Sequence, residues 1–319
     1  MLHNALATVA LMLGIASIAS AQAPQNALKP ICSWGPNPTH LELNVYVPSK
    51  LPPKPAVILA VRQPLAQQHH KRPCTDRRYP QIHFCGGTGP LYANLTEYST
   101  LADTKGFVVL YPTTNNDNHC WDVASPRSLT RNGGGDSTGL AHMVRWAIRK
   151  YRADPKRVFL TGISSGCLMS NVMAATYPDL FAAASCYSGA AAGCLAGSPG
   201  SSPATADPAC GAGRVVKTPA EWAAVAHAMY PGYTGAYPRF QTWHGEADDF
   251  VSYPNLAEQL KQWSALLGVS FSHNVTDTPE AGYTKMVYGD GTKLLGYSAR
   301  GVGHVVPAHE TSDLEWFGL

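Results

Sequence analysis

Short apolar runs alternate with amphipathic stretches along most of this chain. The runs have the length and composition of strands and lie at 41–47, 56–60, 107–111, 158–161, 181–188, 240–243 and 294–299. The runs at 56–60 and 107–111 are apolar at every position, which is typical of strands buried on both faces of a sheet.

Several of the stretches between these runs have the apolar spacing of helices. Over 136–151 the residues Leu140, Val144 and Ala147 recur on one helical face. Further helices are predicted at 167–177, 220–229 and 257–267. Because strands and helices alternate, we predict an α/β fold with a mostly parallel central sheet and helices on both faces. The Gly/Ala/Ser/Pro-rich stretch 189–213 is predicted to be a long surface loop.

The N-terminus has the composition of a secretory signal peptide. An apolar run over 5–18 precedes Ala19-Ser20-Ala21, so we predict a signal peptide at 1–21 and a single mature domain at 22–319. A membrane anchor is the weaker interpretation, because the run is short for a span and no second one follows. The sequons at Asn94 and Asn274 are candidate glycosylation sites and agree with secretion.

Composition and charge exclude several classes of protein. The chain has 319 residues, of which 45% are hydrophobic and 14% charged, and a net charge of +3, so neither disorder nor a nucleic-acid partner is expected. Its eight cysteines fit an oxidising compartment, and none has CxxC or zinc-ligand spacing. His69-His70 has no further ligands nearby, so we expect no metal site.

A G-x-S-x-G motif at 162–166 lies between a predicted buried strand and a predicted helix. The turn at such a motif is so tight that side chains at the two glycine positions would clash, and it lifts the serine hydroxyl above the sheet. The N-terminus of the following helix favours negative charge nearby. We therefore predict that Ser164 is a nucleophile.

A serine hydroxyl needs a base to take its proton, and the base needs an acid to orient it. His304 lies in a Gly-rich loop after the last strand-like run, and Asp248 follows the strand at 240–243. The order Ser164, Asp248, His304 is that of α/β-hydrolases. Asp249 is the alternative acid, and His244 is expected to be structural because it precedes the turn that presents Asp248.

The oxyanion formed in such a reaction needs hydrogen-bond donors. One is the backbone N–H of Ser165, the residue after the nucleophile. The other should come from the Gly-rich loop at 83–89, where Cys85 or its neighbour is the candidate. A phosphate cradle is excluded for this loop, because no Lys-Ser/Thr follows it.

Several longer segments resemble one family of enzymes. They are 120–123 (CWDV), 132–135 (NGGG), 162–166, 171–181 (NVMAATYPDLF), 228–235, 244–248, 301–307 and 313–318 (DLEWFG). Together they resemble the fungal acetylxylan esterases of carbohydrate esterase family 1, with the related feruloyl esterases and polyhydroxybutyrate-depolymerase-like enzymes. The resemblance runs from about Pro36 to Leu319, interrupted after Ala60, and Cys167 departs from the Gly or Ala expected there.

The resemblance implies an α/β-hydrolase fold, secretion, no cofactor and release of acetate from O-acetylated xylan, with Ser164, Asp248 and His304 as the triad. Feruloyl esterase activity is the alternative. A second class of function is a non-catalytic carbohydrate-binding protein with an inactive hydrolase fold, which the intact triad disfavours. Trp121 is a candidate for the substrate cleft, with a core position as its alternative. The expected partner is a plant cell-wall polysaccharide, and the chain is expected to be a monomer.

Two disulfides are predicted, Cys85–Cys120 and Cys194–Cys210. The first would tie the oxyanion loop to the loop that contains Trp121. The second would close a flexible loop, where a cross-link of that size is worth about 3 kcal/mol. Cys167 and Cys186 fall in core-type elements and are predicted to be buried thiols, and Cys32 is left unassigned.

The composition of the segment 61–81 does not suit the interior of a buried strand, where this segment lies in the sequence. It carries five basic residues, two histidines and three prolines, yet joining Ala60 to Ile82 would give one continuous apolar strand that leads into the Gly-rich loop. A tolerated surface insertion is one interpretation. The other, which we favour, is a translated intron: Val codons begin with GT, a Gln codon can end in AG, and the 21 codons span 63 nucleotides.

Overall fold

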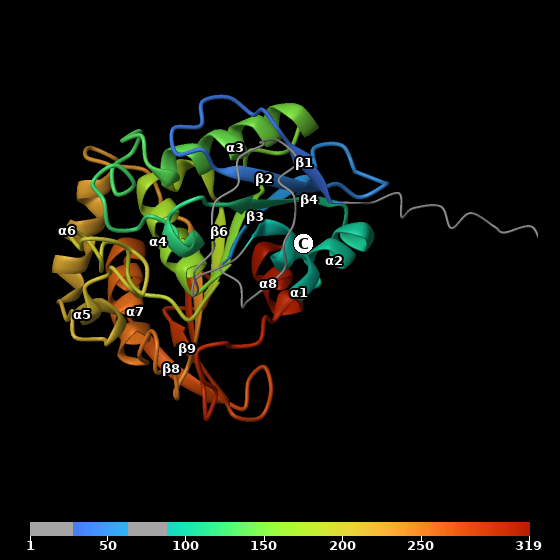
Figure 1. Cartoon of the computed structure of the whole chain (residues 1–319). Helices are drawn as coiled ribbons and strands as arrows, with labels where there is room; N and C mark the ends of the chain where they lie inside the picture. The colour runs from blue at the N-terminus through green and yellow to red at the C-terminus, as the bar shows by residue number, and fades with distance from the viewer. Residues whose placement is uncertain (1–27, 63–87) are drawn as a thin grey trace, which may run out of the picture.

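A ten-stranded sheet runs through the centre of the part of the chain that is described (Figure 1). The computed structural model describes residues 28–62 and 88–319. The strands are β1 Lys29–Ile31, β2 Glu42–Tyr46, β3 Ala56–Arg62, β4 Phe107–Thr113, β5 Val158–Ile163, β6 Ala183–Tyr187, β7 Arg239–Gly245, β8 Phe271–Thr276, β9 Tyr283–Tyr288 and β10 Leu294–Ala299. Their order is β1-β2-β4-β3-β5-β6-β7-β10-β9-β8, and the run from β4 to β10 is parallel throughout.

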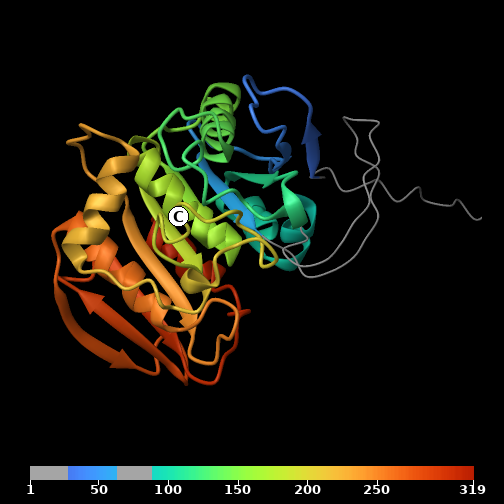
Figure 2. The same cartoon turned by 60° about the vertical axis from the view of Figure 1, so that its left-hand side comes forward.

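Helices cover both faces of this sheet (Figures 1 and 2). One face carries α1 Gly89–Leu95, α2 Tyr98–Lys105 and α8 Glu310–Phe317, and the other carries α3 Asp136–Tyr151, α4 Ser165–Thr176, α6 Pro219–Met229 and α7 Pro254–Leu267. Short elements are α5 Pro208–Gly211, η1 Asp117–His119 and η2 Pro178–Leu180. The predicted α/β architecture is confirmed. Within the described ranges, no helix is both long and apolar enough to cross a membrane.

The apolar character of the central strands follows from their two covered faces. On β3 the alternate residues Val57, Leu59 and Val61 pack into the cluster beneath α3, α4 and α7. Ile58 and Ala60 point the other way, into the cluster with α1, α2 and α8. Because both faces of β3 are covered, these five side chains are all buried and all apolar.

The predicted elements match the structure to within three residues at each boundary, and 136–151 and 294–299 match at both ends. Among the longer elements, five were not predicted, namely α1, α2, α8, β8 and β9. β8 is exposed along its whole length at the edge of the sheet, so its sequence lacks the apolar run that marks the buried strands. α2 likewise has only two buried residues and no strong apolar face.

Two sequence predictions about loops need correction. β3 does not stop at Ala60: Val61 is fully buried, and the backbone of 61–62 continues the parallel pairing with β5. The rest of the segment 61–81, with Ile82, lies outside the described residues. The stretch 189–213 is not a surface loop throughout, because residues 190–192 are buried against the core.

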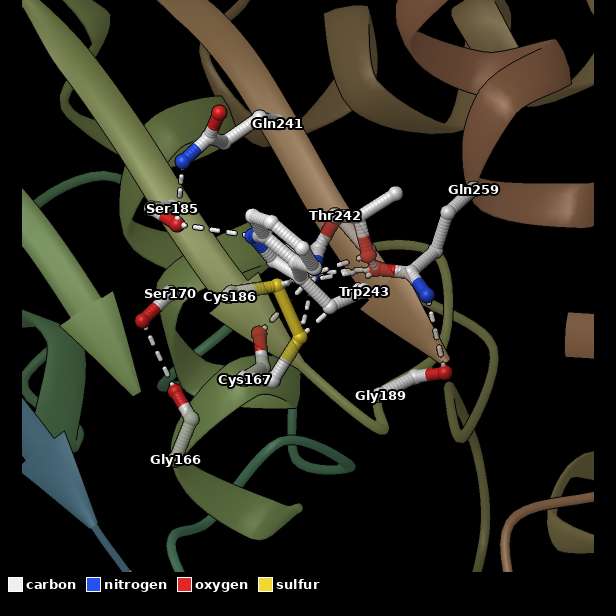
Figure 3. Close-up of a disulfide and its surroundings, with 12 residues drawn as sticks. Gly166, Cys167, Ser170, Ser185, Cys186, Gly189, Gln241, Thr242, Trp243 and Gln259 are labelled. Atoms are coloured by element: carbon white, nitrogen blue, oxygen red, sulfur yellow. Dashed lines mark hydrogen bonds between the residues drawn. A yellow bond between two sulfur atoms is a disulfide. The ribbon is translucent and has the colours of Figure 1, made fainter. Parts of the chain in front are cut away.

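A disulfide joins Cys167 on α4 to Cys186 on β6, with an S–S distance of 2.01 Å (Figure 3). The prediction of two buried thiols is therefore wrong. Gly162 on β5 pairs with Cys186 on β6, and α4 turns back over these strands, which brings the two sulfurs together. The side chains of Thr242 and Gln259 hydrogen-bond to each other beside the disulfide (3.2 Å).

The predicted Cys194–Cys210 disulfide is present, with an S–S distance of 2.05 Å. Cys32 and Cys120 are also disulfide-bonded, and the described part of the chain contains no free cysteine. Cys85, which we predict as the partner of Cys120, lies outside the described residues, so the Cys85–Cys120 pair stays a prediction.

Candidate active site

Ser164 occupies a strained turn between β5 and α4. Its backbone dihedrals are φ 55° and ψ −124°, a conformation that a side-chain-bearing residue rarely adopts. A Cβ at Gly162 would lie 2.4 Å from the Val61 carbonyl oxygen and 2.5 Å from that of Gly166, so only glycine fits there. The Ser164 N–H donates to the Tyr187 carbonyl (2.8 Å), which holds the turn against β6.

Asp248 lies in the turn that follows β7. Its side chain is buried, and Oδ1 accepts hydrogen bonds from the backbone N–H groups of Phe250 (3.0 Å) and Val251 (2.9 Å). Burial opposes ionisation, but hydrogen bonds from His244 and His304 outweigh it and hold the pKa of Asp248 well below its usual range. The carboxylate is therefore ionised at neutral pH.

His304 bridges the other two residues. Its Nδ1 lies 2.8 and 3.0 Å from the two oxygens of Asp248, and its Nε2 lies 2.7 Å from Ser164 Oγ. With Nδ1 donating to the carboxylate, Nε2 carries the lone pair that can accept the serine proton. The alternative acid, Asp249, is exposed, whereas Asp248 makes both contacts with the imidazole.

The Gly-rich loop before His304 passes very close to the end of β7. A Cβ at Gly245 would lie 2.2 Å from the Val302 carbonyl oxygen and 2.4 Å from that of Gly303. The N–H of Ala247 donates to the same Val302 carbonyl (2.9 Å). The absence of a side chain at Gly245 therefore allows the histidine loop to rest on the turn that holds the acid.

His244 lies beneath this turn and is fully buried. Its Nε2 lies 2.6 Å from the Val251 carbonyl oxygen and 3.2 Å from Asp248 Oδ2, and its Nδ1 has no hydrogen-bond partner among the described residues. Because a carbonyl oxygen can only accept, Nε2 is the nitrogen that donates to Val251.

The residues predicted for the oxyanion side are only partly described. Ser165 begins α4, so its backbone N–H is at the positive end of the helix dipole. The Ser165 hydroxyl accepts a hydrogen bond from the backbone N–H of Trp121 (2.9 Å). Cys85 lies outside the described residues. Trp121 is fully buried in the larger core cluster, and its place in a substrate cleft stays a prediction.

The loop that contains Trp121 is held by two carboxylates that the sequence did not single out. Asp136, at the start of α3, accepts hydrogen bonds from Asn116 Nδ2 (2.7 Å) and the Asp122 N–H (3.0 Å). Asp122 in turn accepts from Ser128 Oγ (2.8 Å). Neither carboxylate contacts His304 in the described ranges, so their role is to shape the loop beside α4.

The serine lies in a tight strand-to-helix turn of a mostly parallel sheet, and the acid and the histidine follow later strands. This arrangement defines a serine hydrolase of the α/β-hydrolase type. The family model of Esterase PHB depolymerase matches residues 77–286. The chain belongs to this family.

The chain is similar to several named proteins over nearly its whole length. It is 46% identical to feruloyl esterase B of Neurospora crassa over 294 residues, which cover 92% of this chain and 93% of that protein. It is 41% identical to acetylxylan esterase A of Aspergillus awamori, over 92% of this chain and 90% of that protein. The solved structure of acetyl xylan esterase from Aspergillus awamori aligns with a TM-score of 0.81 at 40% identity, over 92% and 99% of the two chains. The α/β-hydrolase fold and the esterase class are thereby confirmed.

Proposed function

We propose that this protein is a secreted serine esterase that removes O-acetyl groups from xylan. The observation that carries the proposal is the hydrogen-bonded series from Ser164 through His304 to Asp248, in a chain 41% identical to an acetylxylan esterase. The predicted signal peptide at 1–21 supports secretion. We also propose that the enzyme acts as a monomer on plant cell-wall polysaccharide and needs no cofactor, because hydrolysis by this route uses only water.

In the first half of the proposed reaction, His304 Nε2 accepts the proton of the Ser164 hydroxyl. Oγ attacks the acetyl carbonyl carbon, and the carbonyl electron pair moves onto oxygen. The Ser165 N–H and a donor near Cys85 stabilise this oxyanion, and the α4 N-terminus favours its charge. The intermediate collapses, His304 gives its proton to the sugar oxygen, and the alcohol leaves.

In the second half, water hydrolyses the acetyl ester on Ser164. His304 takes one proton from the water while the water oxygen attacks the carbonyl carbon. That proton then passes to Ser164 Oγ as acetic acid leaves, and the acid ionises to acetate in solution. Asp248 keeps the imidazole in the correct tautomer and stabilises the imidazolium in both halves. Because its pKa lies well below the usual range, Asp248 remains ionised throughout.

Feruloyl ester hydrolysis is the second candidate function. It is favoured by the 46% identity to a feruloyl esterase B, slightly above the 41% identity to an acetylxylan esterase. Both reactions use the same triad and free a hydroxyl group of a sugar, so they differ in the acyl group that is released. The hydrogen-bonded triad argues against the non-catalytic carbohydrate-binding alternative.

Substrate assays with the full-length mature enzyme test the proposal. Acetate release from acetylated xylan, ferulate release from methyl ferulate and hydrolysis of 4-nitrophenyl acetate are compared for wild type and Ser164→Ala. We expect the highest kcat/KM on acetylated xylan, and a loss of about 10⁴- to 10⁶-fold in kcat for the variant. A higher kcat/KM on methyl ferulate would favour feruloyl esterase over acetylxylan esterase as the function. Retained turnover in Ser164→Ala would overturn the triad assignment.

A further inference from the structure

An exposed aromatic side chain lies beside the histidine of the site. Among the described residues the large exposed apolar side chains are Leu95, Val216, Phe250, Phe271, Val275 and Val305. Phe250 is 61% exposed, and its ring centroid lies 5.4 Å from that of His304. Val305 follows His304 directly and is 47% exposed. Solvent therefore reaches an apolar surface that adjoins the reacting atoms.

The position of Phe250 is determined by the same turn that holds the acid. Its backbone N–H donates to Asp248 Oδ1 (3.0 Å), while its phenyl ring projects out beside the imidazole. The backbone contact does not depend on the side chain. An aromatic ring at this place therefore adds nothing to the acid's hydrogen bonds, and its exposure leaves apolar surface that a ligand could cover.

The chemistry of the proposed reaction decides which half of the substrate passes this ring. His304 Nε2 must reach the alcohol oxygen of the ester to protonate it, so the alcohol half lies beside His304. The acyl half is instead held by the carbonyl carbon at Ser164 and by the oxyanion donors. In an acetylated xylan the alcohol half is a pyranose ring, whose C–H face is apolar.

We propose that Phe250 forms the binding site for the sugar ring that carries the ester. The inference rests on the proposed function. The sugar's C–H face lies against the phenyl ring and excludes water from it, so Phe250 sets specificity for the alcohol half of the ester. Acetyl and feruloyl esters of the same sugar share this half, so Phe250 contributes equally to both.

The test compares esters that differ in their alcohol. Wild type, Phe250→Ala and Phe250→Tyr are assayed by pH-stat on acetylated xylo-oligosaccharides and on ethyl acetate, whose alcohol is too small to cover the ring. We expect Phe250→Ala to raise KM for the oligosaccharides about three- to tenfold with little change in kcat. The ratio of kcat/KM on oligosaccharide to that on ethyl acetate falls accordingly, and Phe250→Tyr, which keeps the ring, retains it.

Phe271→Ala is the matched control, because Phe271 is 52% exposed on the edge strand β8. It should leave both activities unchanged. An unchanged ratio in Phe250→Ala, or equal losses on both esters, would overturn the inference, the latter by indicating that the ring acts through the triad. Wild type that cleaves only feruloylated oligosaccharides would refute the acetyl proposal, and the ratio would then be measured with feruloylated oligosaccharides against ethyl ferulate. Wild type inactive on all sugar esters would refute both.

Discussion

At the scale of single residues, the acid of the triad depends on a neighbour four positions earlier in the chain. Asp248 receives two backbone hydrogen bonds and two imidazole contacts, and one of these contacts comes from His244, which does not touch Ser164 within the described ranges. His244 also binds the Val251 carbonyl (2.6 Å), which closes the turn. We infer that His244 is a positioning residue for Asp248.

The variant His244→Phe tests this role. It removes the donor to Val251 and Asp248 while keeping a ring, so we expect kcat to fall about tenfold with KM little changed. The free energy of unfolding should fall by about 1 to 3 kcal/mol, because buried acceptors lose their partner. His244→Gln, which can still donate, should recover part of kcat. Lost stability with wild-type kcat in His244→Phe would show a purely structural role.

At the scale of elements, the Cys167–Cys186 disulfide fixes α4 to β6 next to the nucleophile. α4 begins at Ser165 and therefore sets the geometry of Ser164. The Cys194–Cys210 disulfide spans a similar separation, 16 residues against 19, in the loop after β6. The two cross-links should therefore contribute similarly to stability but differently to catalysis.

Double alanine variants of each disulfide separate these contributions. Both variants should lose about 3 kcal/mol of unfolding free energy, measured by urea denaturation. Cys167→Ala/Cys186→Ala should also lower kcat, because the first turn of α4 is no longer tied to the sheet. Cys194→Ala/Cys210→Ala serves as the control and should keep its kcat. Equal kcat values in the two variants would contradict a role for the first disulfide in catalysis.

The C-terminal helix α8 docks through a buried carboxylate. Asp313 is completely buried, and its oxygens accept hydrogen bonds from Tyr187 (2.9 Å), Gln241 (3.0 Å), Tyr98 and Ser185. Burial raises the pKa of Asp313 to about 6, although hydrogen bonds from Ser185, Tyr98 and Tyr187 oppose the rise. The helix is therefore held by a group that binds its proton more tightly in the folded protein.

This raised pKa predicts a pH dependence of stability. The contribution of Asp313 is fully present below the ordinary value of 3.8 and is lost as pH rises to about 6, a loss of about 3 kcal/mol. Asp313→Asn has no proton to lose, so its unfolding free energy should decline less than that of wild type between about pH 4 and pH 7. Exposed Asp249→Asn should keep the wild-type decline. An Asp313→Asn curve parallel to wild type would contradict the prediction.

At the scale of the whole molecule, the continuity of the central sheet bears on the segment 61–81. β3 pairs with both β4 and β5 and is buried on both faces up to Val61. We propose that residues 61–81, of which the first two continue β3, derive from a retained intron, and that the chain without them is the normal esterase. The mature transcript should then lack the 63 nucleotides, and the shortened protein should have higher activity and stability than the 319-residue chain. A transcript that retains them as its main form would refute the proposal.

Much of this molecule could be predicted from local sequence. The buried strands and α3 are recognisable because apolar periodicity reflects burial on one or both sides. The nucleophile is recognisable because a strand, a G-x-S-x-G turn and a helix are contiguous in the chain. β8 was missed because an exposed edge strand needs no apolar pattern, and β9 because only two of its residues are buried. α8 was missed because it is short and its buried residues, Asp313, Leu314, Trp316 and Phe317, include a carboxylate and do not form an apolar helical period.

What the sequence by itself determined is therefore the alternation of elements, the Ser164 turn and the chain order of the triad, since each depends on neighbouring residues. Only the tertiary structure decided which residues meet across the fold. It selected Asp248 over Asp249, joined Cys167 to Cys186, buried Trp121 and brought Phe250 beside His304. These contacts join residues from different elements and loops of the fold, and local periodicity carries no information about which of them meet.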